Sequence, residues 1–200
     1  MAAVVAVAVL AGAAPAGARV FLTTDEALAL AFPGCEVERR TVYLTEGQLA
    51  EARRLAGVEI PGALVNPYVA RCEQGGGAGG ASGAAVPGGT TGSAGTGGTA
   101  YFDTHRVRTL PETLMVVVSP AGEVRRIEVL TFREPEEYLP RGAWYRQFTG
   151  HPLDDGLALK RDVHGVAGAT LTARATATAV RRVLALHRVI AEGAVEGEKP

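Results

Sequence analysis

The hydrophobic and polar positions in the first third of the chain predict two short helices with a strand between them. Thr23 and Glu26 have the spacing of a capping box, and an apolar run follows them. The same spacing recurs at 45–48 and predicts a second helix that ends near Gly57. Between the two helices, Val37–Leu44 alternates between apolar and polar side chains, as a half-buried strand does.

The middle of the chain predicts further strands. Leu64–Val69 has the composition of a second strand, although Asn66-Pro67 interrupts it. After Tyr101, the apolar run Leu114–Ser119 pairs naturally with 123–132 across a Pro-Ala-Gly turn. We therefore expect a β-hairpin there.

The last predicted element is a long amphipathic helix that begins near Ala169 and runs to about Glu192. Its apolar positions recur at intervals of three, four and seven residues, at Val180, Val183, Leu184 and Ile190. Strands followed by a long helix indicate the α+β class. We expect an antiparallel sheet covered by helices, with the long helix at its C-terminus.

Three segments lie outside the predicted domain core, and they leave one domain at 19–192. Ala2–Ala18 is almost wholly apolar and ends in a small-x-small pattern, which favours a signal peptide or an N-terminal membrane anchor. The alternative is a buried Ala/Val segment of a cytoplasmic protein. Half of 75–98 is glycine, which predicts a disordered insertion, and 193–200 is predicted to be a disordered tail.

Charge and cysteine content narrow the function classes. A formal net charge of -1 and scattered arginines give no basic face for nucleic acid. The two cysteines, Cys35 and Cys72, lie far apart and outside any metal, haem or iron-sulfur motif, so we expect no metal site. In an exported protein they could form one disulfide, but two buried thiols fit the sequence equally well.

Aromatic and polar side chains gather around two prolines in the segment 132–148. It holds the only Trp of the chain, Trp144, together with Arg146 and Gln147. Rings can stack on a planar ligand while a guanidinium and an amide bind its edge. An ordinary hydrophobic cover over the sheet is the alternative.

The residues just before the last helix suit a phosphate. Gly168 permits a close approach, and Thr170 and Thr172 bring hydroxyls to the helix start. The first turn of a helix has unpaired N–H groups and a partial positive charge, and both stabilise a bound phosphate. On physical grounds alone, a threonine that caps a helix packed through Ala and Gly is the commoner explanation of this pattern.

The segment Gly168-Ala169-Thr170-Leu171-Thr172 resembles the flavinylation motif of the FMN-binding domain family, Asp-x-x-Ser/Thr-Gly-Ala-Thr. Similarity to the small exported members of that family extends over the C-terminal half of the chain and more loosely over the rest. The resemblance implies FMN as cofactor, attached through a phosphoester to Thr170 by a flavin transferase of the ApbE type outside the cytoplasm. Two positions depart from the motif: Ala167 replaces the Ser/Thr, and His164 stands at the Asp position.

The resemblance implies that the protein is an extracytoplasmic electron-transfer flavoprotein. We expect it to be an electron-carrying redox domain rather than a stand-alone enzyme. Its partners would be the flavin transferase and a membrane or exported redox protein. The predicted site holds no catalytic residue and no metal ligand. Its cofactor-binding residues are His164, Ala167, Gly168, Ala169, Thr170, Leu171, Thr172, Trp144, Arg146 and Gln147. The alternatives are non-covalent FMN, a non-redox exported binding module with a degenerate flavin site, and an enzyme that uses bound FMN on its own substrate.

Overall fold

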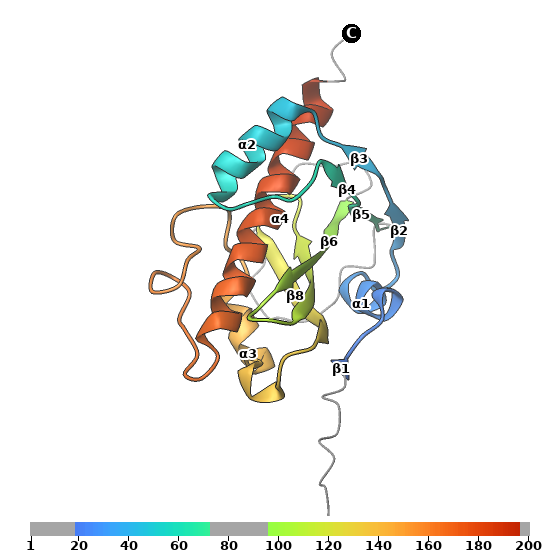
Figure 1. Cartoon of the computed structure of the whole chain (residues 1–200). Helices are drawn as coiled ribbons and strands as arrows, with labels where there is room; N and C mark the ends of the chain where they lie inside the picture. The colour runs from blue at the N-terminus through green and yellow to red at the C-terminus, as the bar shows by residue number, and fades with distance from the viewer. Residues whose placement is uncertain (1–18, 73–95, 197–200) are drawn as a thin grey trace, which may run out of the picture.

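A computed structural model describes residues 19–72 and 96–196 and shows an α+β fold, as expected (Figure 1). Its main sheet has six strands in the order β1-β8-β7-β6-β5-β2, and every neighbouring pair is antiparallel. These strands are β1 (Arg19–Val20), β2 (Glu36–Arg39), β5 (Tyr68–Arg71), β6 (Thr96–Arg106), β7 (Pro111–Val118) and β8 (Val124–Phe132). A separate two-stranded sheet pairs β3 (Val42–Tyr43) with β4 (Leu64–Val65).

Four α-helices and two 3-10 helices complete the described part of the chain. They are α1 (Thr24–Ala31), α2 (Glu46–Ala56), η1 (Glu136–Tyr138), α3 (Gly142–Tyr145), η2 (Arg146–Phe148) and α4 (Thr170–Glu196). Both predicted capping boxes are present, with Thr23 and Thr45 as the N-cap residues of α1 and α2. None of the helices in the described ranges is long and apolar enough to cross a membrane.

The main sheet is covered on both faces. Helices α2 and α4 lie side by side over one face, and α1 lies over the other (Figure 1). Strand β7 is consequently buried on both sides. Leu114 and Val116 point into the core beneath α4, whereas Met115 and Val117 point toward α1, and all four are fully buried.

The predicted hairpin is confirmed as β7 and β8, but the two earlier strands are each split. The strand predicted at Val37–Leu44 is β2 and β3, and the one predicted at Leu64–Val69 is β4 and β5. Both breaks fall where Asn66-Pro67 faces Thr41, whose hydroxyl donates to the Asn66 side chain at 3.1 Å. The chain thereby leaves one sheet and enters the other, because proline cannot continue the ladder of hydrogen bonds.

Two predicted boundaries are wrong by a few residues. Thr96, Gly97 and Gly98, placed in the insertion, belong to β6 and pair with the end of β5. Gly98 has φ +119°, and a Cβ there would lie 2.7 Å from the Val118 carbonyl oxygen, so the close approach of the two strands requires glycine. Helix α4 continues to Glu196, past the expected end at about 192. The remainder of the predicted leader, insertion and tail lies outside the described residues.

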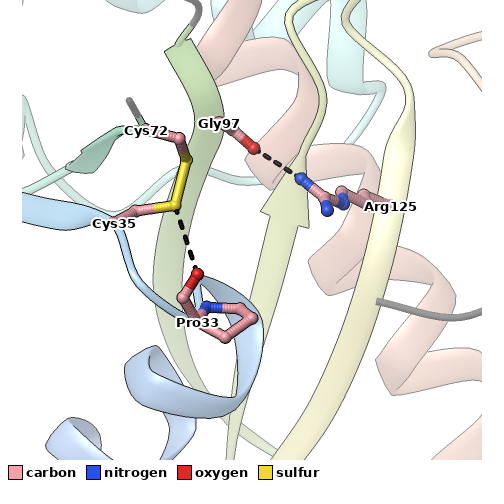
Figure 2. The surroundings of a disulfide bond; sticks show 5 residues. All are labelled: Pro33, Cys35, Cys72, Gly97 and Arg125. Carbon is pink, nitrogen blue, oxygen red and sulfur yellow. Dashed lines mark hydrogen bonds between the residues drawn. A yellow bond between two sulfur atoms is a disulfide. The ribbon is translucent and has the colours of Figure 1, made fainter. Parts of the chain in front are cut away.

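Cys35 and Cys72 form a disulfide that joins the start of β2 to the end of β5 (Figure 2). Gly97 on the neighbouring β6 makes room for it, because a Cβ there would lie 2.3 Å from the Cys72 sulfur. Arg125 of β8 donates a hydrogen bond of 2.6 Å to the Gly97 carbonyl (Figure 2). The disulfide therefore links β2 to β5 at the end of the sheet where the chain enters the Gly-rich segment.

Candidate functional site

The motif forms the junction between a turn and the first residue of α4. Gly168 has φ +82°, a left-handed conformation that glycine adopts without strain. The Ala169 N–H donates to the Val166 carbonyl at 3.1 Å and closes the turn, and α4 begins at Thr170. Ala169 therefore occupies the N-cap position, and its methyl side chain cannot accept a hydrogen bond from the free N–H groups. The first turn contains no acidic residue either, so its positive end is open to an anion.

The two threonines of the motif have different environments. The Thr170 side chain is exposed, and its hydroxyl makes one long contact of 3.4 Å to the Val166 carbonyl. Thr172 is fully buried and donates a hydrogen bond of 2.6 Å to the Tyr138 carbonyl in η1. Between them, Leu171 is 46% exposed. Only Thr170 thus presents a hydroxyl that an outside reagent can reach.

Trp144 and Gln147 lie beside the loop that leads into the motif, where their polar groups contact the main chain of His164. The indole N–H of Trp144 donates to the His164 carbonyl at 2.7 Å. The Gln147 amide oxygen accepts from the His164 N–H at 2.7 Å, and its nitrogen contacts the same carbonyl at 3.5 Å. The His164 ring is solvent-exposed. These hydrogen bonds hold in place the loop segment at His164, which leads into the motif.

Arg146 lies elsewhere. Its side chain lines a groove of about 1220 Å³ beside β8, together with residues of α1 and the disulfide. No residue of 164–172 lines that groove. The structure therefore brings Trp144 and Gln147 to the motif but places Arg146 on a different surface.

A pocket of about 610 Å³ opens next to Thr170. Its two walls are the loop formed by 157–160 and 165–167 and one face of α4. The volume falls within the roughly 300–1,000 Å³ that small-molecule and cofactor sites occupy. Three cationic side chains line it, namely Lys160, Arg174 and Arg181. Ala167 lies on the same wall and brings no hydroxyl.

Arg181 fixes the loop wall of this pocket. Its guanidinium donates to the Ala56 carbonyl at 2.9 Å and to the Asp154 carbonyl. Lys160 lies further along the loop with φ +67°, and it is the only described residue other than glycine with a positive φ. Sequence reasoning missed Lys160 and Arg174. The spacing of Arg174, four residues after Thr170, was the one available signal.

A buried polar network lies between β6, β7 and α4, and it too was not predicted. Arg182 binds both carboxylate oxygens of Asp103, at 2.7 and 2.8 Å. His105 contacts Asp103 through Nδ1 at 2.9 Å and Glu112 through Nε2 at 3.1 Å. Burial alone would lower the pKa of His105, but the two carboxylates outweigh burial and raise it to about 9. Burial raises the pKa of Glu112, which is fully enclosed.

Comparison with known proteins identifies the cofactor. Residues 110–185 match the family model of the FMN-binding domain, a range that includes the β7–β8 hairpin, Trp144 and the start of α4. No curated protein and no solved structure matches the chain significantly. Residues 110–185 therefore match an FMN-binding domain, and this match supports FMN as the cofactor. In the described ranges, no cluster of three or more His, Cys, Asp or Glu residues could hold a metal ion.

Proposed function

We propose that this FMN-binding domain carries FMN on Thr170 through a phosphoester and serves as an electron-transfer flavoprotein outside the cytoplasm. The observation that carries the proposal is the position of Thr170. Its exposed hydroxyl lies at the first residue of α4, next to a pocket of about 610 Å³. The hydroxyl of Thr172, two residues on, is enclosed and already bonded to Tyr138.

The environment of Thr170 suits a phosphoester. The N–H groups of the first turn of α4 have no intrahelical partner, and the helix dipole adds partial positive charge at that end. Both stabilise the negative charge that a phosphodiester keeps after it is formed. The turn at Gly168 is open on its outer side, because apart from its two chain neighbours nothing lies within 4 Å of a Cβ built there.

The attachment reaction requires FAD and a flavin transferase of the ApbE type. The Thr170 oxygen forms a new bond to the flavin-side phosphorus of FAD. The bond from that phosphorus to the bridging oxygen breaks, AMP leaves with the bridging oxygen, and the hydroxyl proton passes to a base. No electrons are gained or lost. The exposure of Thr170 allows a separate protein to reach it.

The two departures from the family motif leave the attachment point intact. At His164 the loop is held through its main chain, by hydrogen bonds with Trp144 and Gln147, and the His164 ring itself is exposed. Ala167 lines the pocket and brings no hydroxyl to its wall. The hydroxyl that forms the ester belongs to Thr170.

Once bound, FMN supplies the redox chemistry through its isoalloxazine ring, and the protein positions it. Leu171, which is 46% exposed, is the apolar side chain that follows the attachment point, and Trp144 is bonded to the His164 carbonyl in the loop before it. The Cys35–Cys72 disulfide and the apolar Ala2–Ala18 support a location outside the cytoplasm, where disulfides persist. The electron partner would be a membrane or exported redox protein.

The proposal is tested by co-expression with an ApbE-type transferase, followed by intact mass and in-gel flavin fluorescence after denaturation. Thr170→Val should lose both the added mass of FMN and the fluorescence, while Thr170→Ser keeps them because it retains a hydroxyl. The matched control is Thr178→Val, which alters another threonine of α4 that lines the same pocket. A parent protein that stays unmodified and binds no added FMN would exclude a flavoprotein and favour a non-redox binding module.

The electron-carrying role needs a separate measurement. The flavinylated protein should be reduced by dithionite and reoxidised with full recovery of its visible spectrum. Cell fractionation should then find it outside the cytoplasm. A flavoprotein retained in the cytoplasm would contradict the proposed location while leaving the attachment to Thr170 intact.

A further inference from the structure

The face of α4 that lines the pocket next to Thr170 is positively charged. Residues 170, 174, 178 and 181 lie on that face, because successive positions are three or four residues apart. Lys160 approaches from the loop opposite. Among the described residues that line the pocket there is no acidic side chain, so three cations share it without a carboxylate. A pocket of this kind attracts an anion.

Arg174 is the cation that remains available. Arg181 is engaged with two main-chain carbonyls, of Ala56 and Asp154. Arg174, by contrast, makes no hydrogen bond or ion pair with any residue in the described ranges, and its side chain is exposed. Its five N–H donors are therefore free for a ligand.

The helix geometry directs Arg174 toward the attachment point. Arg174 lies four residues after Thr170, about 6 Å further along the axis of α4. Long side chains on a helix lean toward its N-terminus and cover the preceding turn. A guanidinium at position 174 can therefore reach the turn that begins at Thr170, and both residues line the same pocket.

Lys160 is held in an unusual conformation on the opposite wall. Its φ of +67° is unfavourable for a residue with a Cβ, and a hydrogen bond of 3.0 Å from its N–H to the Val163 carbonyl maintains it. Non-glycine residues in this conformation concentrate at ligand sites, where the surrounding structure holds them in place.

We propose that Arg174, with Lys160 opposite it, binds the phosphate of the flavin and makes this pocket select phosphorylated flavin over riboflavin. The proposal rests on the FMN-binding function above and assigns a positioning role to Arg174 within it. A guanidinium can donate two parallel hydrogen bonds to a phosphate, and the helix N–H groups bind its other side. The same contacts hold the flavin phosphate of an incoming FAD next to the Thr170 hydroxyl.

The proposal is tested on the protein produced without a transferase, so that Thr170 carries no ester. FMN and riboflavin are titrated separately, with flavin fluorescence as the readout, against the parent and Arg174→Gln. The matched control is Arg188→Gln, an exposed arginine of the same helix that pairs with Glu192 at 3.1 Å and lies outside the pocket. Thermal unfolding of each variant checks the fold.

The parent should bind FMN more tightly than riboflavin, and Arg174→Gln should weaken FMN binding about tenfold or more while leaving riboflavin binding unchanged. Lys160→Gln should act in the same direction, and added salt should weaken FMN binding only. Arg188→Gln should behave like the parent. Equal affinities of the parent for FMN and riboflavin would overturn the proposal. Equal losses for both ligands in Arg174→Gln would also overturn it, because they would place Arg174 against the ring or the fold.

The outcomes separate this proposal from the proposed function. If Thr170 is flavinylated but Arg174→Gln keeps the parent's preference for FMN, only the role of Arg174 is wrong. If Thr170 is never flavinylated but Arg174→Gln abolishes the preference, the phosphate site stands and the covalent link is wrong. A protein that binds no flavin in either experiment contradicts both.

Discussion

The Thr172 hydroxyl donates a hydrogen bond of 2.6 Å to the main-chain carbonyl of Tyr138. This bond joins the first turn of α4 to η1, two elements 34 residues apart in the sequence. Since Thr172 is fully buried, no solvent can replace the bond. It therefore fixes the direction in which the first turn of α4 presents Thr170.

Replacing Thr172 with Val should destabilise the fold by about 1–3 kcal/mol, because the change leaves the Tyr138 carbonyl without its buried donor. Chemical denaturation measures the loss, and Thr172→Ser, which keeps the hydroxyl, should recover most of it. Thr172→Val that folds should still be flavinylated on Thr170. Loss of the flavin from stably folded Thr172→Val would instead place Thr172 in the attachment site.

Trp144→Phe should weaken the loop that leads into the motif. The change keeps a ring to pack against Tyr145 and Phe148 but removes the indole N–H that donates to the His164 carbonyl. We expect a loss of about 1 kcal/mol in the free energy of unfolding and a slower rate of flavinylation. Urea denaturation and a time course of flavin incorporation measure the two effects. An unchanged rate would show that the loop is held without this bond.

The sequence predicted those parts of the fold that depend on local patterns. The capping boxes at Thr23 and Thr45, the hairpin and the long helix each have a signal within a few residues. The division of Val37–Leu44 between two sheets could not be predicted. It depends on the contact between Thr41 and Asn66, 25 residues away, and periodicity carries no such information.

The candidate site, too, could be predicted only where its residues follow one another in the sequence. Thr170 could be predicted because the motif is contiguous, and the structure places its hydroxyl at the surface. The pocket wall with Lys160 was not found, since Arg181 positions that loop through bonds to carbonyls far away in the sequence. The buried network was missed for another reason. Asp103 and His105 lie on the buried face of a strand, where polar residues are not expected unless partners are known.

Removal of the disulfide should destabilise the protein without affecting flavinylation. The bond closes a loop with a sequence separation of 37, for which chain entropy gives about 4 kcal/mol. Cys35→Ala/Cys72→Ala should unfold at lower denaturant concentration and be insensitive to reducing agent. Its flavin content should match the parent's, because neither cysteine lines the pocket beside Thr170.

Gly97→Ala provides the internal control for the disulfide. In the parent the new methyl would lie 2.3 Å from the Cys72 sulfur, so the substitution should be strongly destabilising. In Cys35→Ala/Cys72→Ala the sulfur is gone, and the same substitution should cost less. Equal costs in the two backgrounds would contradict the requirement for glycine at this position.

The stability of the protein should fall as the pH rises from about 6.5 to about 9, because of His105. In the folded protein, Asp103 and Glu112 hold the pKa of His105 at about 9, above the ordinary value of 6.5. Charged His105 therefore stabilises the fold fully below pH 6.5, and this contribution disappears as the pH passes through about 9. The shift corresponds to at most about 3 kcal/mol. His187 has the opposite effect on stability. Burial lowers its pKa, so its contribution to stability is lost as the pH falls.

Free energies of unfolding measured between pH 6 and pH 10 should show the alkaline decline in the parent and a flatter profile in His105→Gln. A decline of the same size in both proteins would mean that another group, and not His105, titrates on unfolding.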